Sequence, residues 1–168
     1  MRQLVLGGTR SGKSREAERL VTAFADGAPV TYVATARVDG DPALDDRITA
    51  HRLRRPAHWR TIEAGDDLPD LLLRLEGPVL LDAVGPWVAG RWPDQPDVDG
   101  LIGALRSRDG DTVVVSEEVG LSIHPETAAG RLFVDVMGTI NQAIASVADD
   151  VRLVIAGRVL PLPPPEGD

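Results

Sequence analysis

Short apolar runs alternate along this chain with stretches in which apolar residues recur at helical spacing. Five runs are short and mainly apolar or β-branched, which is typical of strands buried on both faces. They cover residues 4–6, 30–34, 79–81, 112–116 and 151–156. The alternation of such strands with helices predicts the α/β class, a mainly parallel sheet with helices on both faces.

The helical pattern is clearest from Ser14 onward, where Ala17, Leu20, Val21 and Phe24 fall at helical spacing. Further helices are predicted at residues 42–54, 66–76, 98–108 and 127–148. Residues 85–100 contain Pro, Gly and Trp and are expected to form a connection. The 168 residues suit a single domain, residues 1–159, followed by a Pro-rich tail, residues 160–168, that is extended or disordered.

Composition narrows the range of functions. The net charge of −8 and the pI of about 4.8 argue against a nucleic-acid partner. No segment is long and apolar enough for a membrane span, and no signal-peptide pattern is present, so the cytoplasm is the expected compartment. Cysteine is absent, which excludes disulfides and thiolate metal ligands. Arginine is common, yet lysine occurs only at Lys13, which indicates a position that requires a compact ammonium group.

This lysine lies in a phosphate-binding motif, G-x-x-x-x-G-K-[ST], between the first strand and the first helix. The motif comprises Gly7, Gly8, Thr9, Arg10, Ser11, Gly12, Lys13 and Ser14. In such a loop backbone N–H groups face the phosphates, Lys13 reaches the β- and γ-phosphates, and the Ser14 hydroxyl joins the Mg²⁺ shell. A glycine-rich turn that matches by chance is the competing interpretation, and the strand–loop–helix context disfavours it. The pattern predicts a P-loop enzyme that acts on the phosphates of GTP or ATP.

An apolar strand that ends in a carboxylate supplies a second candidate ligand for Mg²⁺. Asp82 directly follows the run at 79–81, as in a Walker B element, although an Asp that caps a turn is the alternative. Residues 82–85 also spell the D-x-x-G of a GTPase switch. The Asn-Lys-x-Asp motif that reads guanine in those proteins needs a second lysine, so a GTPase of that kind is disfavoured.

Polar side chains concentrate between residues 45 and 63, where two histidines, several arginines and a tryptophan lie together. His51 shares a helical face with Leu44 and Ile48, so its spacing alone favours a half-buried packing histidine. The arginines that follow would then form a solvated helix end, which the helix dipole favours. A reactive histidine is the other interpretation, and the spacing leaves both open.

The sequence resembles a known family, the bifunctional adenosylcobinamide kinase and adenosylcobinamide-phosphate guanylyltransferase of cobalamin biosynthesis. The likeness rests on the Gly-Gly-x-Arg-Ser-Gly-Lys-Ser loop and on Arg-Ile-x-x-His at 47–51, followed by Arg-Pro-Ala-His-Trp-Arg-Thr at 55–61. Glu-Val-Gly and Pro-Glu within residues 118–126 add to it, and the likeness extends to the last predicted strand. Many enzymes share a P-loop, whereas its combination with the histidine segment is specific.

The resemblance implies a RecA-like P-loop fold, a homotrimer, bound Mg²⁺, GTP and ATP as substrates, and a corrinoid substrate. It matches His51 to the family's guanylylated histidine, so that His51 and Lys13 are the implied catalytic residues. Beyond the P-loop, the implied nucleotide-binding residues are Ala34, Thr35, Arg52, Leu53, Arg54, Arg55, Glu63 and Asp82. The implied Mg²⁺ ligands are Ser14 and Asp82.

Three features depart from the family's usual pattern. Glu117 and Thr127 stand where Asn is usual, and residues 83–87 differ from the commoner Cys-Leu-Thr type. These departures bear on the corrinoid side or the kinase half-reaction and leave the phosphate loop unchanged. Two other functions stay open: a single-activity P-loop kinase for a small metabolite, which needs no reactive His51, and a nucleotide-binding regulator without chemistry.

Overall fold

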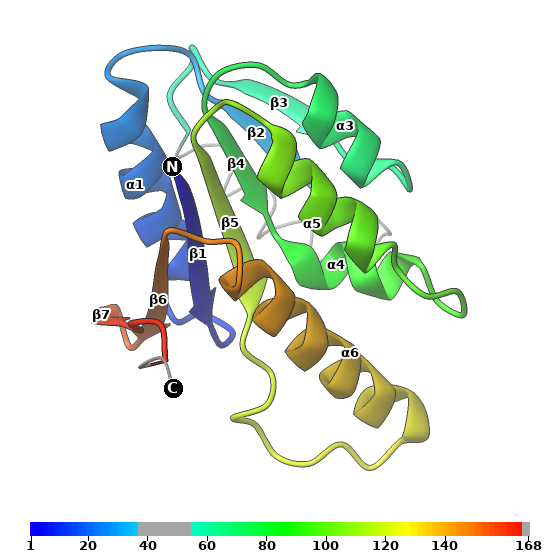
Figure 1. The fold of residues 1–168 in the computed structure, drawn as a ribbon. Coiled ribbons are helices and arrows are strands. Elements are labelled where there is room, and N and C mark those ends of the chain that lie inside the picture. The colour runs from blue at the N-terminus through cyan, green and yellow to red at the C-terminus, as the bar shows by residue number, and fades with distance from the viewer. Residues whose placement is uncertain (37–54, 166–168) are drawn as a thin grey trace.

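The computed structural model describes residues 1–36 and 55–165, which form a seven-stranded sheet in the order β3-β2-β4-β5-β1-β6-β7 (Figure 1). Neighbouring strands are parallel except for the antiparallel pair β6 and β7. The strands are β1 (Arg2–Gly7), β2 (Thr31–Ala34), β3 (Arg60–Glu63), β4 (Val79–Asp82), β5 (Thr112–Glu117), β6 (Asp150–Ile155) and β7 (Arg158–Pro161). The helices are α1 (Lys13–Ala25), α3 (Leu68–Arg74), α4 (Val84–Gly90), α5 (Val98–Ser107) and α6 (Ala128–Ala145).

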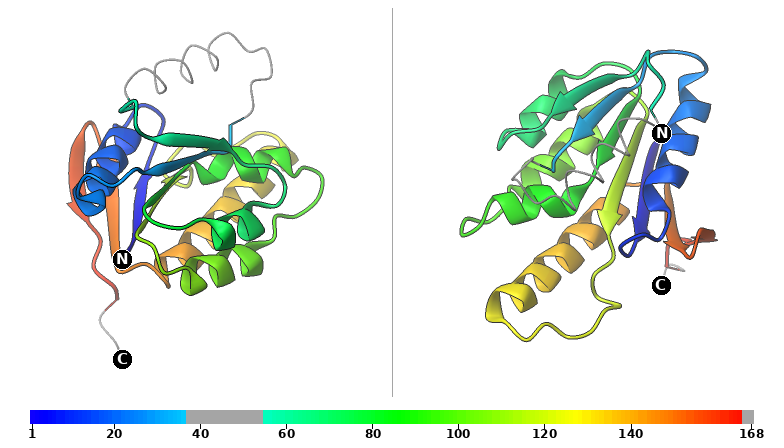
Figure 2. Two further views of the ribbon diagram at one scale, coloured as in Figure 1. Left: turned by 90° about the horizontal axis from the view of Figure 1, so that it is seen from above. Right: turned by 180° about the vertical axis from the view of Figure 1, so that it is seen from behind.

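The helices cover both faces of the sheet. Figures 1 and 2 show α1 on one face and α3 to α6 on the other. Side chains of β1 alternate between two buried clusters, because successive strand residues point to opposite faces. Leu4 and Leu6 pack with the α3–α6 side, whereas Val5 packs with the α1 side. The predicted α/β class with a mainly parallel sheet and helices on both faces is confirmed.

All five predicted strands are present, and so are the helices predicted after residue 14 and at 66–76, 98–108 and 127–148. The helix predicted at 42–54 lies outside the described residues. The expectation that residues 85–100 form only a connection is wrong, because α4 occupies the first part of that stretch. The pattern also missed β3 and β7, and Leu160 and Pro161, assigned above to the tail, belong to β7.

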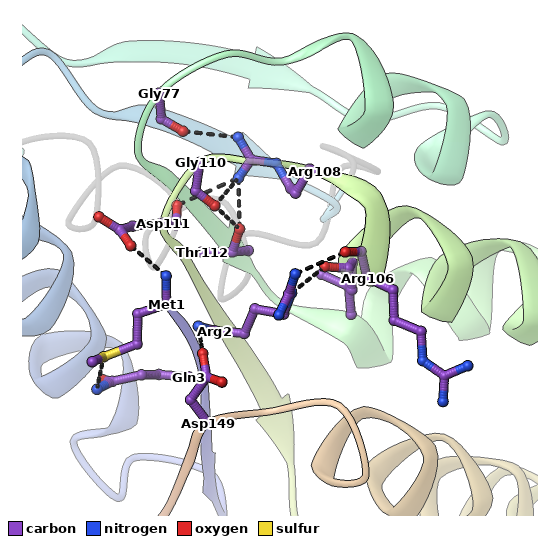
Figure 3. A network of polar contacts seen from close by, with 11 residues as sticks. Met1, Arg2, Gln3, Gly77, Arg106, Arg108, Gly110, Asp111, Thr112 and Asp149 are labelled. Carbon is purple, nitrogen blue, oxygen red and sulfur yellow. Dashed lines mark hydrogen bonds and ion pairs between the residues drawn. The ribbon is translucent and has the colours of Figure 1, made fainter.

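A buried arginine fixes the amino ends of the strands, opposite to the ends that carry the phosphate motif. The Arg108 guanidinium donates to the carbonyl oxygens of Leu75 and Gly77 at 3.1 and 2.8 Å and to Thr112 Oγ1 at 2.6 Å. Figure 3 shows the contacts with Gly77 and Thr112. Arg108 is buried, with 5% of its surface exposed, and this burial lowers the pKa of its guanidinium. The contacts tie the segment before β4 to the start of β5 and the end of α5.

None of the helices in residues 1–36 and 55–165 is long and apolar enough to cross a membrane.

Candidate active site

The carboxyl ends of the parallel strands bring the polar residues of the site together. The register pairs Gly7 at the end of β1 with Glu117 at the end of β5. It also pairs Ala34 of β2 with Asp82 of β4 and with Glu63 of β3. In open α/β sheets ligands bind in the crevice beyond these ends. The predicted phosphate loop and the predicted acidic residue therefore lie on the same edge of the sheet.

The phosphate loop has the backbone conformation that its glycines permit. A Cβ atom on Gly7 would lie 2.5 Å from Ser11 Oγ and 2.7 Å from the Val154 carbonyl oxygen, so only glycine fits there. Gly12 has a φ of 100°, in the left-handed region, and directly precedes α1. The turn between β6 and β7 supports the loop from outside, since Gly157 N–H donates to the Ser11 carbonyl at 2.8 Å. These contacts set the loop at the amino end of α1, where the helix dipole favours an anion.

Lys13 extends across this loop and is almost completely buried, with 7% of its surface exposed. Its Nζ donates to the Gly8 carbonyl at 3.4 Å and lies 3.8 Å from Glu117 Oε1. The ammonium group is thus held between the loop and the end of β5. A phosphate bound by the loop amides would meet this group directly.

Ser14 and Asp82 meet at the other side of the loop, as the sequence predicts for two ligands of one metal ion. Ser14 Oγ donates to Asp82 Oδ1 at 3.3 Å, and the Tyr32 hydroxyl donates to Asp82 Oδ2 at 2.5 Å. Burial first, and then the Asp82 carboxylate, raise the pKa of Tyr32, so Tyr32 stays a donor. One hydroxyl and one carboxylate are hard oxygen ligands and fit Mg²⁺, which takes its other ligands from water and phosphate. No group of three His, Cys, Asp or Glu side chains suited to a metal ion occurs in the described part of the chain.

Thr35 links the ends of β2 and β4. Its hydroxyl accepts from the Ala83 N–H at 3.1 Å and donates to the Ala83 carbonyl oxygen. The side chain is buried and fully engaged in these two contacts. Thr35 therefore positions the backbone that follows Asp82, and Ala34 lies beside Asp82 in the sheet register.

Arg55 connects the edge of the sheet to Asp82 through Tyr32. Its guanidinium carbon lies 3.3 Å from the centroid of the Tyr32 ring, and its Nη1 donates to Thr61 Oγ1 at 3.2 Å. Such cation–π stacking stabilises both groups. A pocket of about 490 Å³ adjoins this contact and is lined by Arg55, Pro56, Ala57, Trp59, Thr61 and Glu63.

The structure brings together most of the predicted site residues that it describes. The P-loop, Ala34, Thr35 and Asp82 share one edge of the sheet, and Arg55 and Glu63 line the adjoining pocket. His51, Arg52, Leu53 and Arg54 lie outside the described residues.

Sequence reasoning missed Tyr32 and Gly157, and it noted Glu117 only as a departure. Burial raises the pKa of Glu117, and the attraction of Lys13 partly opposes that rise. No local pattern marks any of these residues, because their roles depend on which strands become neighbours. Strand order was therefore the missing information.

A P-loop at the first strand–helix turn, with a carboxylate at the end of a nearby parallel strand, defines a P-loop nucleotide-binding domain. The fold agrees with solved structures of low sequence identity. The flagellar accessory protein FlaH from Methanocaldococcus jannaschii has a TM-score of 0.52 and 15% identity, over 94% of this chain and 74% of that chain. An ATPase from the type III secretion system of pathogenic bacteria has a TM-score of 0.52 and 9% identity, over 90% of this chain and 50% of that chain.

Sequence comparison narrows the class to one family. The family model described as cobinamide kinase / cobinamide phosphate guanyltransferase, CobU, matches residues 3–162, so the chain belongs to this family. A bifunctional adenosylcobalamin biosynthesis protein, CobP, from Pseudomonas aeruginosa is 41% identical over 96% of this chain and 97% of its own length. The protein CobU from Escherichia coli, with the same description, is 36% identical over 92% of this chain and 95% of its own length. The resemblance inferred from the motifs is confirmed.

Proposed function

We propose that this chain phosphorylates adenosylcobinamide with ATP or GTP and then transfers GMP from GTP to adenosylcobinamide phosphate. Membership of the cobinamide kinase / cobinamide phosphate guanyltransferase family supports both activities. The observation that carries the proposal is the buried Lys13 in a formed phosphate loop, beside the pair Ser14 and Asp82.

In the kinase step the acceptor hydroxyl attacks the γ-phosphorus, and the bond from that phosphorus to the bridging oxygen breaks. The chain contributes positioning and charge: loop amides and Lys13 hold the triphosphate and neutralise charge that develops on the transferred group. Ser14 and Asp82 would hold Mg²⁺, which supplies further neutralisation of phosphate charge when bound.

In the guanylyl-transfer step we assign the nucleophile to His51. Its neutral imidazole attacks the α-phosphorus of GTP, a nitrogen–phosphorus bond forms, and pyrophosphate leaves. A phosphate oxygen of adenosylcobinamide phosphate then attacks the same phosphorus, the nitrogen–phosphorus bond breaks, and His51 is released with adenosylcobinamide-GDP as the product. Splitting one transfer into two is the general advantage of a covalent nucleophile. An imidazole with its ordinary pKa of about 6.5 is largely neutral at pH 7.

The three histidines allow a matched test with GTP labelled at the α-phosphorus. His51→Ala should abolish the acid-labile label on the protein, whereas kinase activity should partly survive. His58→Ala and His124→Ala are the controls, because both side chains are exposed and neither belongs to the proposed site. Undiminished labelling of His51→Ala would remove this residue from the role.

A second experiment separates an enzyme from a regulator. The chain is incubated with GTP, Mg²⁺ and adenosylcobinamide, and pyrophosphate and corrinoid products are measured. We expect both products, and Lys13→Ala should depress both reactions because they share one triphosphate site. Phosphorylation without any guanylyl transfer would instead indicate a single-activity kinase.

The assembly implied by the resemblance, a homotrimer, belongs to the proposal as well. Light scattering on the purified chain, coupled to size-exclusion chromatography, measures it, and a mass other than three chains would contradict it.

A further inference from the structure

The P-loop lysine of this chain faces a carboxylate. Lys13 Nζ lies 3.8 Å from Glu117 Oε1, and the lysine is buried. The side chain of the partner carboxylate is 24% exposed, and this partial burial raises the pKa of Glu117. A negative charge therefore stands at the point where the terminal phosphates of a nucleotide would meet the ammonium group.

The Glu117 side chain is held in this orientation by its surroundings. Gly85 N–H donates to Glu117 Oε2 at 2.9 Å, and Asn141 Nδ2 donates to the Glu117 carbonyl oxygen at 3.0 Å. Ser116 Oγ donates to Asn141 Oδ1 at 2.6 Å, which fixes the Asn141 amide in turn. A Cβ on Gly85 would lie 2.5 Å from Glu117 Oε2, and its three nearest atoms all belong to Glu117. The carboxylate thus occupies a space that a glycine leaves open for it.

We propose that Glu117 is a positioning residue that holds Lys13 when no nucleotide is bound and competes with the terminal phosphates for its ammonium group. When a triphosphate binds, Lys13 exchanges the carboxylate for phosphate oxygens, and Glu117 is left close to an anion of the same sign. Two negative charges that lie close together in a partly buried site repel each other strongly. Glu117 therefore lowers the affinity of the site for nucleoside triphosphates.

This inference rests on the proposed function only in taking a nucleoside triphosphate as the ligand. The test is a binding titration with Mg²⁺ and a GTP analogue whose imido bridge between the α- and β-phosphates prevents GMP transfer. Glu117→Gln keeps the shape and removes the charge, so we expect its Kd to fall about tenfold, which corresponds to about 1.4 kcal/mol. Glu117→Asp keeps the charge, so its Kd should lie closer to the Kd of the native chain than the Kd of Glu117→Gln does.

A second variant displaces the carboxylate without removing it. Gly85→Ala places a methyl group against Glu117 Oε2, so it should also tighten binding. Gly90→Ala is its control, because the added Cβ lies in the same helix and meets no atom within 4 Å. Glu76→Gln is the charge control: this exposed side chain precedes β4, at the end of the sheet opposite to the loop. Melting temperatures show whether each variant is folded.

The kinetic signature separates this role from a structural one. In the kinase assay Glu117→Gln should lower KM for the triphosphate without raising kcat. The reason is that the substitution changes the free energy of triphosphate binding and leaves the barrier to phosphoryl transfer from the bound state unchanged. A merely structural residue would lower kcat or the melting temperature instead. An unchanged or weaker Kd for Glu117→Gln would overturn the inference, and so would the absence of saturable binding to the native chain.

Binding is measured without any corrinoid, so the two proposals fail separately. Tighter binding by Glu117→Gln in a chain that does not act on adenosylcobinamide would reject the proposed function and leave this inference standing. Turnover of the corrinoid, together with an unchanged Kd for Glu117→Gln, would support the proposed function and reject this inference.

Discussion

Replacing Arg108 with methionine should destabilise the fold without weakening nucleotide binding. Methionine keeps much of the apolar stem and removes the guanidinium, which leaves the carbonyls of Leu75 and Gly77 without this donor. Each buried acceptor that is left without a donor typically costs about 1–3 kcal/mol. Arg108 Nε has no hydrogen-bond partner, so the substitution also removes one unsatisfied buried donor, which offsets part of the cost. For the two carbonyls we therefore expect a loss of about 3–4 kcal/mol in the free energy of unfolding.

Urea denaturation of the nucleotide-free chain measures this loss, and a thermal scan gives a second value. For a domain of this size 1 kcal/mol shifts the melting temperature by about 2–4 °C, so a decrease of roughly 6–16 °C is expected. Arg106→Met is the matched control, because Arg106 lies near the end of the same helix and its side chain is exposed and points away from the network (Figure 3).

Two results would refute the reasoning on Arg108. A loss below about 1 kcal/mol, or an equal loss for Arg106→Met, would mean that the buried guanidinium contributes little. Weaker nucleotide binding by a folded Arg108→Met chain would mean that the site is not confined to the carboxyl ends of the strands.

Three further predictions concern the site itself. Gly7→Ala should weaken nucleotide binding at least tenfold, because the new methyl group would lie 2.5 Å from Ser11 Oγ and displace the loop; a titration with a fluorescent GTP analogue measures this. Tyr32→Phe should lower the free energy of unfolding by about 1.5–3 kcal/mol, since Asp82 loses a hydrogen bond while the aromatic ring remains; urea denaturation that shows no change would contradict it. Burial raises the pKa of Glu117, so ionisation of this group lowers stability as the pH rises from the ordinary carboxyl range through the raised pKa. The stability of Glu117→Gln relative to the native chain should therefore increase with pH in denaturation series, and a difference independent of pH would contradict this assignment.

Much of the fold follows from the sequence because parallel strands are buried on both faces. The run at 112–116 lies at the centre of the sheet, is buried throughout around three consecutive valines, and was predicted nearly to its ends. The missed strands β3 and β7 are the two outermost strands. Their residues are mostly exposed: β3 has no apolar run, and the short Val-Leu-Pro run of β7 continues into the Pro-rich segment that was assigned to the tail. Helix α4 was missed because Gly85 and Pro86 resemble a turn, although a proline in the first turn of a helix loses no hydrogen bond.

The residues of the site likewise fall into two groups, those that a local sequence pattern marks and those that it does not. The phosphate loop and Asp82 are local signals, a motif and a strand end, and the structure places Ser14 Oγ within 3.3 Å of Asp82 as expected. Tyr32 and Glu117 are not recognisable locally. Their contacts with Asp82 and Lys13 arise only when β2 pairs with β4 and β5 pairs with β1. Those pairings depend on contacts between distant segments, and a single sequence does not reveal them.

The strand order also explains why one position can adjust the phosphate site without altering its chemistry. Strand β5 lies between β1, which carries the phosphate loop, and β4, which ends at Asp82. The last residue of β5 is therefore adjacent to the loop lysine, yet it belongs to neither motif. Substitution of Lys13 or Asp82 removes a group that we propose to contact phosphate or metal, whereas substitution of Glu117 changes only the electrostatic field around Lys13. The end of the intervening strand is thus where the affinity for triphosphate can vary while the phosphate-binding motif stays the same.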